Sequence, residues 1–182
     1  MKEILIFSSK GGVGKTTLVE AIRQCLSPAE VVDLDPQGSL SIALQMASIP
    51  LAPSNSKYRL YDSAPYNDGA LDQIMLKVDH IFVPERLGYP DLLAFRTVYE
   101  RLLAAKATRK ALIVFNEVRK PLPIEAREVL RLFRKNYPNV KIASSFISRL
   151  EAFRKLFRFP IDGKAAAQIT SLLAEIGINI VR

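Results

Sequence analysis

The chain carries the stretch Ser9-Lys10-Gly11-Gly12-Val13-Gly14-Lys15-Thr16-Thr17 directly after the apolar run Ile4-Leu5-Ile6-Phe7, and a segment with helical periodicity follows it. Glycines let main-chain N–H groups approach a polyphosphate closely, and the start of the following helix adds unpaired donors and a partial positive charge. Lys15 can reach the β- and γ-phosphates of a nucleotide, and the Thr16 hydroxyl can contact Mg²⁺. We therefore predict a strand, a phosphate-binding loop and a helix, with nucleotide contacts from Gly11, Gly12, Val13, Gly14, Lys15, Thr16 and Thr17.

The loop departs from the usual pattern G-x-x-x-x-G-K-[ST], because Ser9 stands where a glycine is expected. It also has a second lysine, Lys10, placed five residues before Lys15. This arrangement resembles the deviant Walker A motif of the ParA/MinD family of P-loop ATPases. The resemblance implies that Lys10 is a signature lysine that reaches the partner's phosphates across a nucleotide-sandwich dimer, much as an arginine finger does. The alternative is a glycine turn with two solvated lysines.

Length and composition indicate one soluble globular domain over residues 1–182, with 49% hydrophobic and 24% charged residues. No apolar run approaches the roughly 20 residues needed to span a membrane, and no signal-peptide pattern opens the chain. Cys25 is the single cysteine and His80 the single histidine, which disfavours disulfide frameworks, cysteine metal clusters and histidine-based sites. We expect a reducing compartment, the cytoplasm.

The net charge of +8 is unevenly distributed along the chain. Residues 96–160 hold 16 lysines and arginines against 5 acidic residues, whereas the remaining residues hold 10 against 13. A region with such a basic excess predicts a polyanionic partner, with DNA the first candidate. Solvated helix faces are the alternative.

Apolar runs alternate with helical patterns along the whole chain, which is typical of βαβ units and a mostly parallel sheet. The predicted fold class is α/β, with a twisted sheet between two layers of helices. The predicted strands are Lys2–Ser8, Glu30–Asp35, Tyr58–Asp62, His80–Pro84, Ala111–Asn116 and Val140–Ile147. The predicted helices are Gly14–Leu26, Leu40–Ala47, Gly69–Val78, Asp91–Lys106, Ile124–Asn136, Arg149–Phe157 and Lys164–Ile176.

Two carboxylates end the second predicted strand, in the segment Asp33-Leu34-Asp35-Pro36-Gln37-Gly38. Ligands bind at this edge of an open parallel sheet, and residues two apart on a strand point the same way. Asp33 and Asp35 could therefore face one site if the strand runs through both. The segment resembles the switch I motif of ParA proteins, which implies that Asp35 positions and activates the attacking water and that Asp33 supports it. Ordinary surface acids at a strand end are the alternative.

Asp62 ends the third predicted strand, in an arrangement like the Walker B motif. Its carboxylate is expected to hold Mg²⁺ opposite the Thr16 hydroxyl. The family usually has two prolines after this aspartate, whereas this chain has Ala64 before Pro65. Asn116 closes the fifth predicted strand, where family members often place a residue that contacts the base, and strand-end capping competes with that role.

Basic side chains recur at helical spacing in two segments of the second half of the chain. Such stripes suit contacts with phosphate backbones that are largely independent of base sequence. The candidate DNA-binding residues are Arg127 and Arg131 in one segment, and Arg149, Arg154, Lys155 and Arg158 in the other.

The resemblance covers roughly residues 2–177 and is closest to the small ParF-like plasmid-partition ATPases. It implies a weak ATPase that uses ATP and Mg²⁺, with Lys10, Lys15 and Asp35 in catalysis. It also implies an ATP-dependent homodimer on nonspecific nucleoid DNA, stimulated by a centromere-binding ParB-type adaptor, with no membrane partner. The alternatives are a MinD-like or cargo-positioning ATPase and, less favoured, a nitrogenase-reductase-like protein or a cofactor amidase.

Overall fold

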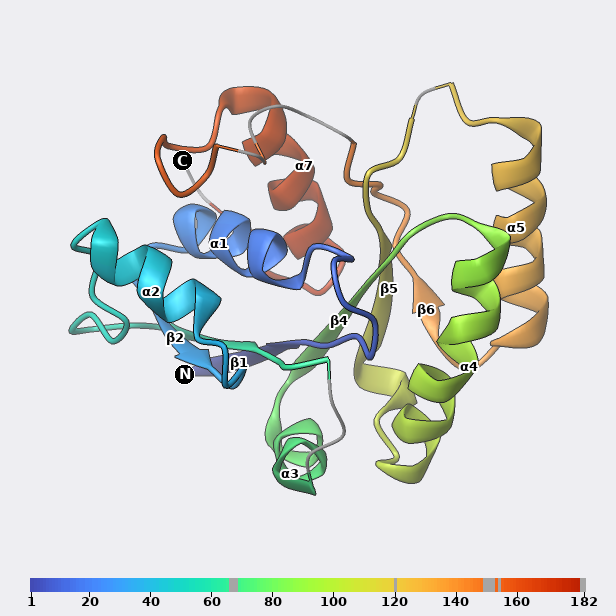
Figure 1. Cartoon of the computed structure of the whole chain (residues 1–182), viewed down its shortest axis with the longest axis horizontal. Helices are drawn as coiled ribbons and strands as arrows, with labels where there is room; N and C mark the ends of the chain where they lie inside the picture. The colour runs from blue at the N-terminus through green and yellow to red at the C-terminus, as the bar shows by residue number, and fades with distance from the viewer. Residues whose placement is uncertain (66–68, 120, 149–152, 154, 181–182) are drawn as a thin grey trace.

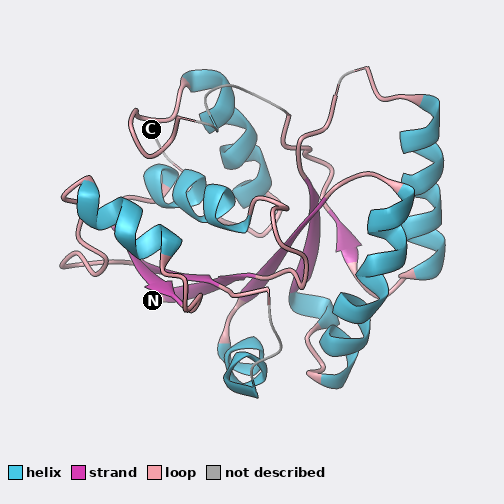
Figure 2. Ribbon diagram, viewed as in Figure 1, coloured by secondary structure: helices cyan, strands magenta, loops and turns pink. Residues whose placement is uncertain are grey.

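A computed structural model describes residues 1–65, 69–119, 121–148, 153 and 155–180. Six strands form one parallel sheet in the order β2-β3-β1-β4-β5-β6 (Figures 1 and 2). The strands are β1 (Lys2–Ile6), β2 (Ala29–Asp33), β3 (Tyr58–Asp62), β4 (His80–Glu85), β5 (Ala111–Phe115) and β6 (Lys141–Ile142). The predicted fold class is confirmed, and the first five strands lie within two residues of their predicted bounds.

In the described part of the chain, α-helices and one short 3-10 helix follow these strands. They are α1 (Lys15–Cys25), α2 (Ser39–Met46), α3 (Gly69–Lys77), α4 (Tyr89–Ala104), η1 (Thr108–Lys110), α5 (Ile124–Asn136) and α7 (Gly163–Ala174). Because each strand is followed by a helix that returns along the sheet, all neighbouring strands pair in parallel.

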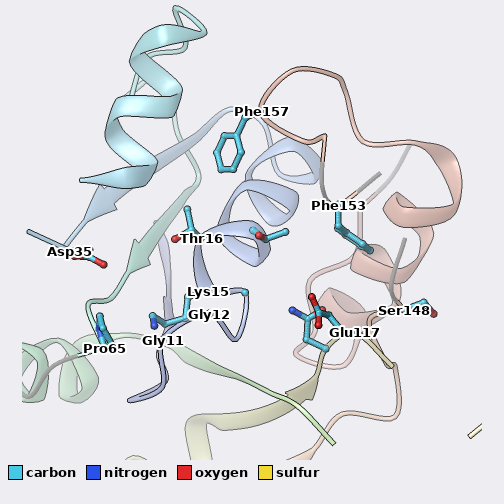
Figure 3. A pocket seen from close by; sticks show the side chains of 13 residues that line it. Gly11, Gly12, Lys15, Thr16, Asp35, Pro65, Glu117, Ser148, Phe153 and Phe157 are labelled. Atoms are coloured by element: carbon cyan, nitrogen blue, oxygen red, sulfur yellow. The ribbon is translucent and has the colours of Figure 1, made fainter. Parts of the chain in front are cut away.

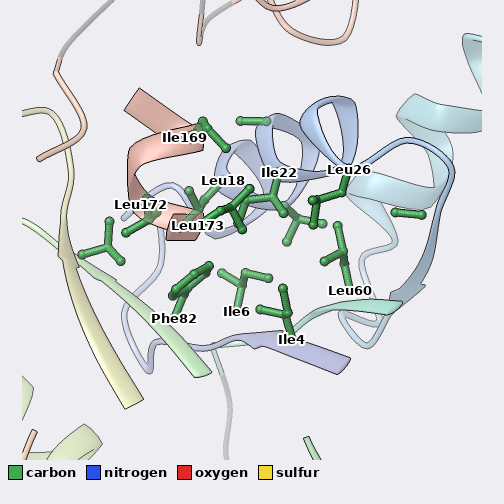
Figure 4. Packing of buried hydrophobic residues seen from close by; sticks show 14 of the residues in the cluster. Ile4, Ile6, Leu18, Ile22, Leu26, Leu60, Phe82, Ile169, Leu172 and Leu173 are labelled. Carbon is green, nitrogen blue, oxygen red and sulfur yellow. The ribbon is translucent and has the colours of Figure 1, made fainter. Parts of the chain in front are cut away.

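The two faces of the sheet carry separate hydrophobic clusters. Side chains alternate along a strand, so Ile4 and Ile6 of β1 point to one face while Leu5 and Phe7 point to the other. Helices α1, α2 and α7 cover the first face, where Ile22 and Leu172 pack over Ile6 and Phe82 (Figure 4). Helices α3, α4 and α5 cover the second face. Strands buried on both sides explain why the sequence shows continuous apolar runs.

The central strands place the loops that matter for function. β1 lies between β3 and β4. The helix after β1 packs on one face of the sheet, whereas the helices after β3 and β4 pack on the other. The loops that follow β1 and β4 therefore leave the same sheet edge toward opposite faces, which is where open α/β sheets bind ligands.

The last strand is shorter than predicted. The sequence predicts Val140–Ile147, but the strand ends at Ile142. The backbone N–H groups of Ser144 and Ser145 donate to the Glu175 carboxylate at 2.9 and 2.8 Å, so they do not continue the ladder. The helix predicted at 149–157 falls largely outside the described residues, and 155–159 form turns and bends.

The loop after α2 contacts the opposite edge of the sheet at one point. The N–H of Val31 on edge strand β2 donates to the carbonyl of Leu51 at 2.6 Å, so the segment after α2 pairs with the strand. None of the described helices is long and apolar enough to cross a membrane.

Candidate nucleotide site

A hollow of about 440 Å³ opens at the carboxyl edge of the sheet, which is a size that suits a nucleotide (Figure 3). The phosphate-binding loop and the start of α1 form its floor, and Asp35 and Pro65 stand at one side. Its described lining residues are Gly11, Gly12, Gly14, Lys15, Thr16, Thr17, Asp35, Pro65, Asn116, Glu117, Ser148, Phe153 and Phe157. The structure thus brings most of the predicted nucleotide contacts together, while Val13 is buried beneath the loop.

The loop backbone has the conformation that a phosphate cradle requires. Gly12 and Gly14 have φ angles of 70° and 93°, in the left-handed region that side chains disfavour. Gly14 is the N-cap of α1 and offers no side chain to the first-turn N–H groups. Those donors are therefore available to an anion, which the positive end of the helix also attracts.

Lys15 lies almost buried at the base of the hollow, where its Nζ donates to the Lys10 carbonyl at 3.2 Å. Burial lowers the pKa of its ammonium group, while the nearby carboxylates of Asp62, Asp35 and Glu85 act in the opposite direction. An anionic phosphate at the hollow would add a favourable partner to a charge that burial makes costly.

Thr16 and Asp62 meet as the magnesium prediction requires. The Thr16 hydroxyl donates to Oδ2 of Asp62 at 2.7 Å, and Oδ1 of the buried Asp62 has no hydrogen-bond partner among the described residues. Burial raises the pKa of Asp62 to about 7, although the bond from Thr16 acts in the opposite direction. A hard cation accepts such carboxylate and hydroxyl oxygens, so the residues present fit Mg²⁺.

The two switch-like aspartates have different surroundings. β2 ends at Asp33, whose carboxylate accepts from the N–H groups of Asp35 and Ser41 at 3.1 and 2.9 Å, and so fixes the turn and the start of α2. Asp35 lies beyond the strand and lines the hollow. The turn after Asp35 closes at Gly38, which has a φ of 61°. The assumption that one strand runs through both aspartates is therefore wrong, and the turn is the reason.

Lys10 points away from the hollow. Its ammonium forms an ion pair with Asp91, at the start of α4, and its side chain keeps 36% of its surface exposed. Lys15 and Thr16 line the hollow, whereas Lys10 is not among its lining residues. The two loop lysines thus have separate surroundings.

Sequence reasoning missed the charged end of β4. Glu85 is 1% exposed, its Oε1 accepts from the Ser8 hydroxyl at 3.0 Å, and its Oε2 has no partner in the described part of the chain. Burial raises the pKa of Glu85 to about 7. Arg86 follows and donates to the carbonyl of Gly12 at 3.0 Å. The sequence offers one signal for these two residues. Glu85 and Arg86 directly follow the apolar run His80–Pro84, and ligands bind at the edge where such a strand ends.

The family follows from a comparison with known domains. A model of the CobQ/CobB/MinD/ParA nucleotide binding domain matches residues 4–159. The chain belongs to this family. The resemblance drawn from the loop lysines is thereby confirmed, and no curated protein matches the chain.

Solved structures of this ParA/MinD type share the fold. The ATP complex of a McdA variant from Cyanothece has a TM-score of 0.78 and 15% identity, over 100% of this chain and 98% of that one. A putative plasmid partition protein of Borrelia burgdorferi bound to AMPPNP has a TM-score of 0.73 and 14% identity, over 97% and 98%. MinD in the MinC:MinD complex of Aquifex aeolicus has a TM-score of 0.73 and 17% identity, over 100% and 98%.

The candidate DNA-binding residues of this family member lie in two places. Arg127 and Arg131 are exposed on α5, which packs on the second face of the sheet. Lys155 and Arg158 are exposed in a turn whose neighbours Leu156 and Phe157 pack on the first face. Arg149 and Arg154 lie outside the described residues. The basic region therefore divides between opposite faces of the sheet.

Two aromatic side chains add a wall to the nucleotide site. Phe153 and Phe157 line the hollow, and both also pack against the cluster under α1 and α7 (Figure 3). Both side chains pack inward, and their position beside the hollow is visible only in the folded chain. Phe153 and Phe157 are thus in contact with both the core and the nucleotide site.

Proposed function

We propose that this protein is a partition ATPase that binds ATP and Mg²⁺, dimerises, holds nonspecific DNA and releases it after hydrolysis. The proposal is supported by the family, by the loop and helix geometry, and by a plasmid partition protein among the structures that share the fold. We also propose that a ParB-type adaptor stimulates hydrolysis and that the protein associates with the nucleoid.

The proposed chemistry follows the placement of charge. Lys15 and the loop N–H groups bind the β- and γ-phosphates, and Asp35 orients the attacking water. Thr16 and Asp62 would hold Mg²⁺, which supplies positive charge to the polyphosphate when it is bound. Lys10 of a second subunit neutralises charge that develops on the transferring phosphoryl group.

The observation that carries the proposal is the position of Lys10. Its ammonium lies outside the hollow of its own subunit, on the loop that borders the phosphate site, and it is one-third exposed. The Lys10 ammonium thus lies next to the phosphate site of its own subunit without entering it. This position suits a contact with the nucleotide of a neighbouring copy.

The test measures nucleotide binding and molecular mass in solution for the native chain, Lys10→Ala and Lys15→Ala. We expect the native chain to bind ATP and to double its mass with a non-hydrolysable analogue and Mg²⁺. Lys10→Ala should bind ATP but remain a monomer, whereas Lys15→Ala should lose ATP binding. A native chain that binds no ATP would refute the proposal, and dimerisation of Lys10→Ala would remove the lysine from its role in trans.

A MinD-like membrane role is the alternative class, and the packing of the described C-terminal residues favours DNA. Ile176, Ile178 and Ile180 all contact the cluster between α1 and α7, so this segment presents its apolar side chains to the core. ATP-dependent retention on DNA, compared with flotation on anionic liposomes at the same salt concentration, separates the two roles.

A further inference from the structure

Two carbonyl groups of the phosphate-binding loop are held by side chains from neighbouring strand ends. Nη2 of Arg86, just after β4, donates to the carbonyl of Gly12 at 3.0 Å. Nδ2 of Asn116, just after β5, donates to the carbonyl of Val13 at 3.0 Å. These two peptide groups are consecutive, so both bonds act on the part of the loop that precedes α1.

The direction of a carbonyl fixes the direction of the N–H in the same peptide group. In a planar trans peptide the two point in opposite directions. The Gly12 carbonyl turned toward Arg86 therefore turns the N–H of Val13 the other way, and the Val13 carbonyl does the same for the N–H of Gly14. Arg86 lines a second hollow of about 260 Å³ and not the nucleotide hollow, so it approaches the loop from the outer side.

Asn116 is fixed against the loop by several contacts. Its backbone N–H donates to the Glu85 carbonyl at 2.8 Å, and its Oδ1 accepts from the N–H of Glu117 at 2.8 Å. A Cβ added at Gly14 would meet Nδ2 of Asn116 at 2.3 Å, so the amide lies directly against the loop backbone. One N–H of Nδ2 and one lone pair of Oδ1 are thus engaged within the chain, so the amide is held in place against the loop.

Glu117 links the two side chains. It follows Asn116, and its carboxylate lies 3.5 Å from Nη2 of Arg86, with both side chains about half exposed. An exposed pair of this kind contributes little to stability. It does restrict the orientation of the guanidinium that contacts Gly12.

We propose that Arg86 and Asn116 are positioning residues of the phosphate-binding loop: Arg86 turns the N–H of Val13 toward the phosphates, and Asn116 fixes the peptide group between Val13 and Gly14. The inference rests on the proposed nucleotide binding and assigns Asn116 a role at the phosphate cradle. It requires that both side chains act on the polyphosphate portion of any ligand, whatever base is attached.

Calorimetric titration with ATP and with inorganic tripolyphosphate, which lacks a base, tests this assignment. Arg86→Ala and Asn116→Ala should each weaken binding of both ligands about tenfold, as expected when a hydrogen bond that orders the cradle is lost. Arg96→Ala is the matched control, because Arg96 is an arginine on α4 with a 78% exposed side chain, and it should change neither affinity. Thermal unfolding midpoints of the variants should stay close to that of the native chain.

Two further measurements separate positioning from simple charge. Because salt screens exposed charges, a purely electrostatic effect of Arg86 fades at about 0.5 M salt, whereas the positioning effect persists. Arg86→Lys keeps a donor and should recover part of the affinity.

A loss of ATP affinity alone in Asn116→Ala would assign this residue to the base and overturn the inference. Unchanged binding in both variants, or a loss in Arg86→Ala that disappears at high salt, would overturn it as well. These results leave native ATP binding intact, so they differ from the failure of the proposed function, in which the native chain binds neither ligand.

Discussion

At the scale of single residues, the buried Glu85 predicts a pH-dependent stability. Its pKa is raised from 4.5 to about 7, and burial is the main cause. The Asp91 carboxylate acts in the same direction, whereas the Ser8 hydrogen bond and the ammonium groups of Lys10 and Lys15 act in the opposite direction. Between these pH values the folded chain holds a proton that the unfolded chain has released. The contribution of Glu85 to stability is therefore largest below about pH 4.5 and declines as the pH rises through about 7.

Glu85→Gln removes this titration while keeping a neutral polar side chain next to Ser8. Without nucleotide, the free energy of unfolding should fall less for the variant than for the native chain when the pH rises from 5.5 to 8. We expect the two decreases to differ by about a few kcal/mol at most. Urea unfolding at both pH values measures the difference. Glu100→Gln, an exposed glutamate paired with Arg96, serves as the control. Parallel pH profiles for the native chain and Glu85→Gln would contradict the prediction.

Asp35 is the second residue whose role can be tested alone. Its carboxylate lines the hollow and accepts from the N–H of Gln37 at 2.9 Å, which orients it. Because the proposed role is to orient water and not to bind phosphate, Asp35→Ala should keep ATP affinity and lose hydrolysis about a hundredfold or more. Asp33→Ala is the matched comparison, and its effect should appear in stability, since Asp33 caps the turn and α2. Normal turnover in Asp35→Ala would exclude it from catalysis.

The sequence predicts some residues of the site well and others not at all. Local motifs with fixed spacing identify Lys15, Thr16 and Asp62, because one loop and one strand end suffice to place them. Arg86 was missed because its partner, Gly12, lies 74 positions away in the chain. Asn116 was predicted as a base contact, but a single sequence does not show that its amide meets the Val13 carbonyl.

At the scale of elements, the loop after β1 and the start of α4 are joined by the pair of Lys10 and Asp91. The Asp91 side chain is 10% exposed, so this ion pair is partly shielded from water. If Lys10 acts on a partner's nucleotide, it must first leave Asp91. In the proposed mechanism, the cis pair would therefore compete with dimer formation.

Asp91→Asn should weaken this competition and tighten the ATP-dependent dimer by up to about tenfold, the value expected for one charge-assisted hydrogen bond. Sedimentation equilibrium with a non-hydrolysable ATP analogue measures the dimer dissociation constant. Glu100→Gln removes an ion pair from the same helix at a site remote from the loop, and it should leave this constant unchanged. An unchanged or weaker dimer in Asp91→Asn would mean that the pair does not restrain Lys10.

The element boundaries show where pattern reasoning ends. The apolar pattern predicts five strands within two residues, because burial on both faces requires continuous apolar runs. It overextends β6, since it does not reveal that the carboxylate of Glu175, which follows α7, takes the N–H groups of Ser144 and Ser145. Competition between distant polar groups for one backbone segment is a tertiary effect.

At the scale of the whole molecule, the basic clusters on α5 and in the turn 155–158 lie on opposite faces of the sheet. The proposed DNA binding depends on ATP, so the cluster in contact with the nucleotide site is the stronger candidate. That cluster is the turn, because neighbouring Phe153 and Phe157 line the hollow.

Replacing Lys155 and Arg158 together by glutamine should lower the slope of the logarithm of DNA affinity against the logarithm of salt concentration by about two. The matched pair Arg131→Gln and Arg134→Gln on α5 should leave the slope unchanged. Fluorescence anisotropy with duplex DNA, ATP analogue and Mg²⁺ over a range of salt concentrations measures both. If the α5 pair carries the slope instead, DNA binds the other face.

The bond between Val31 and Leu51 has a consequence for crowding. A bare outer strand offers unpaired backbone groups to a neighbouring molecule and so invites fibrous aggregation. Here the chain's own loop occupies part of that position on β2. In the proposed DNA-bound state, where copies would lie close together, this contact would disfavour strand-to-strand pairing between neighbours.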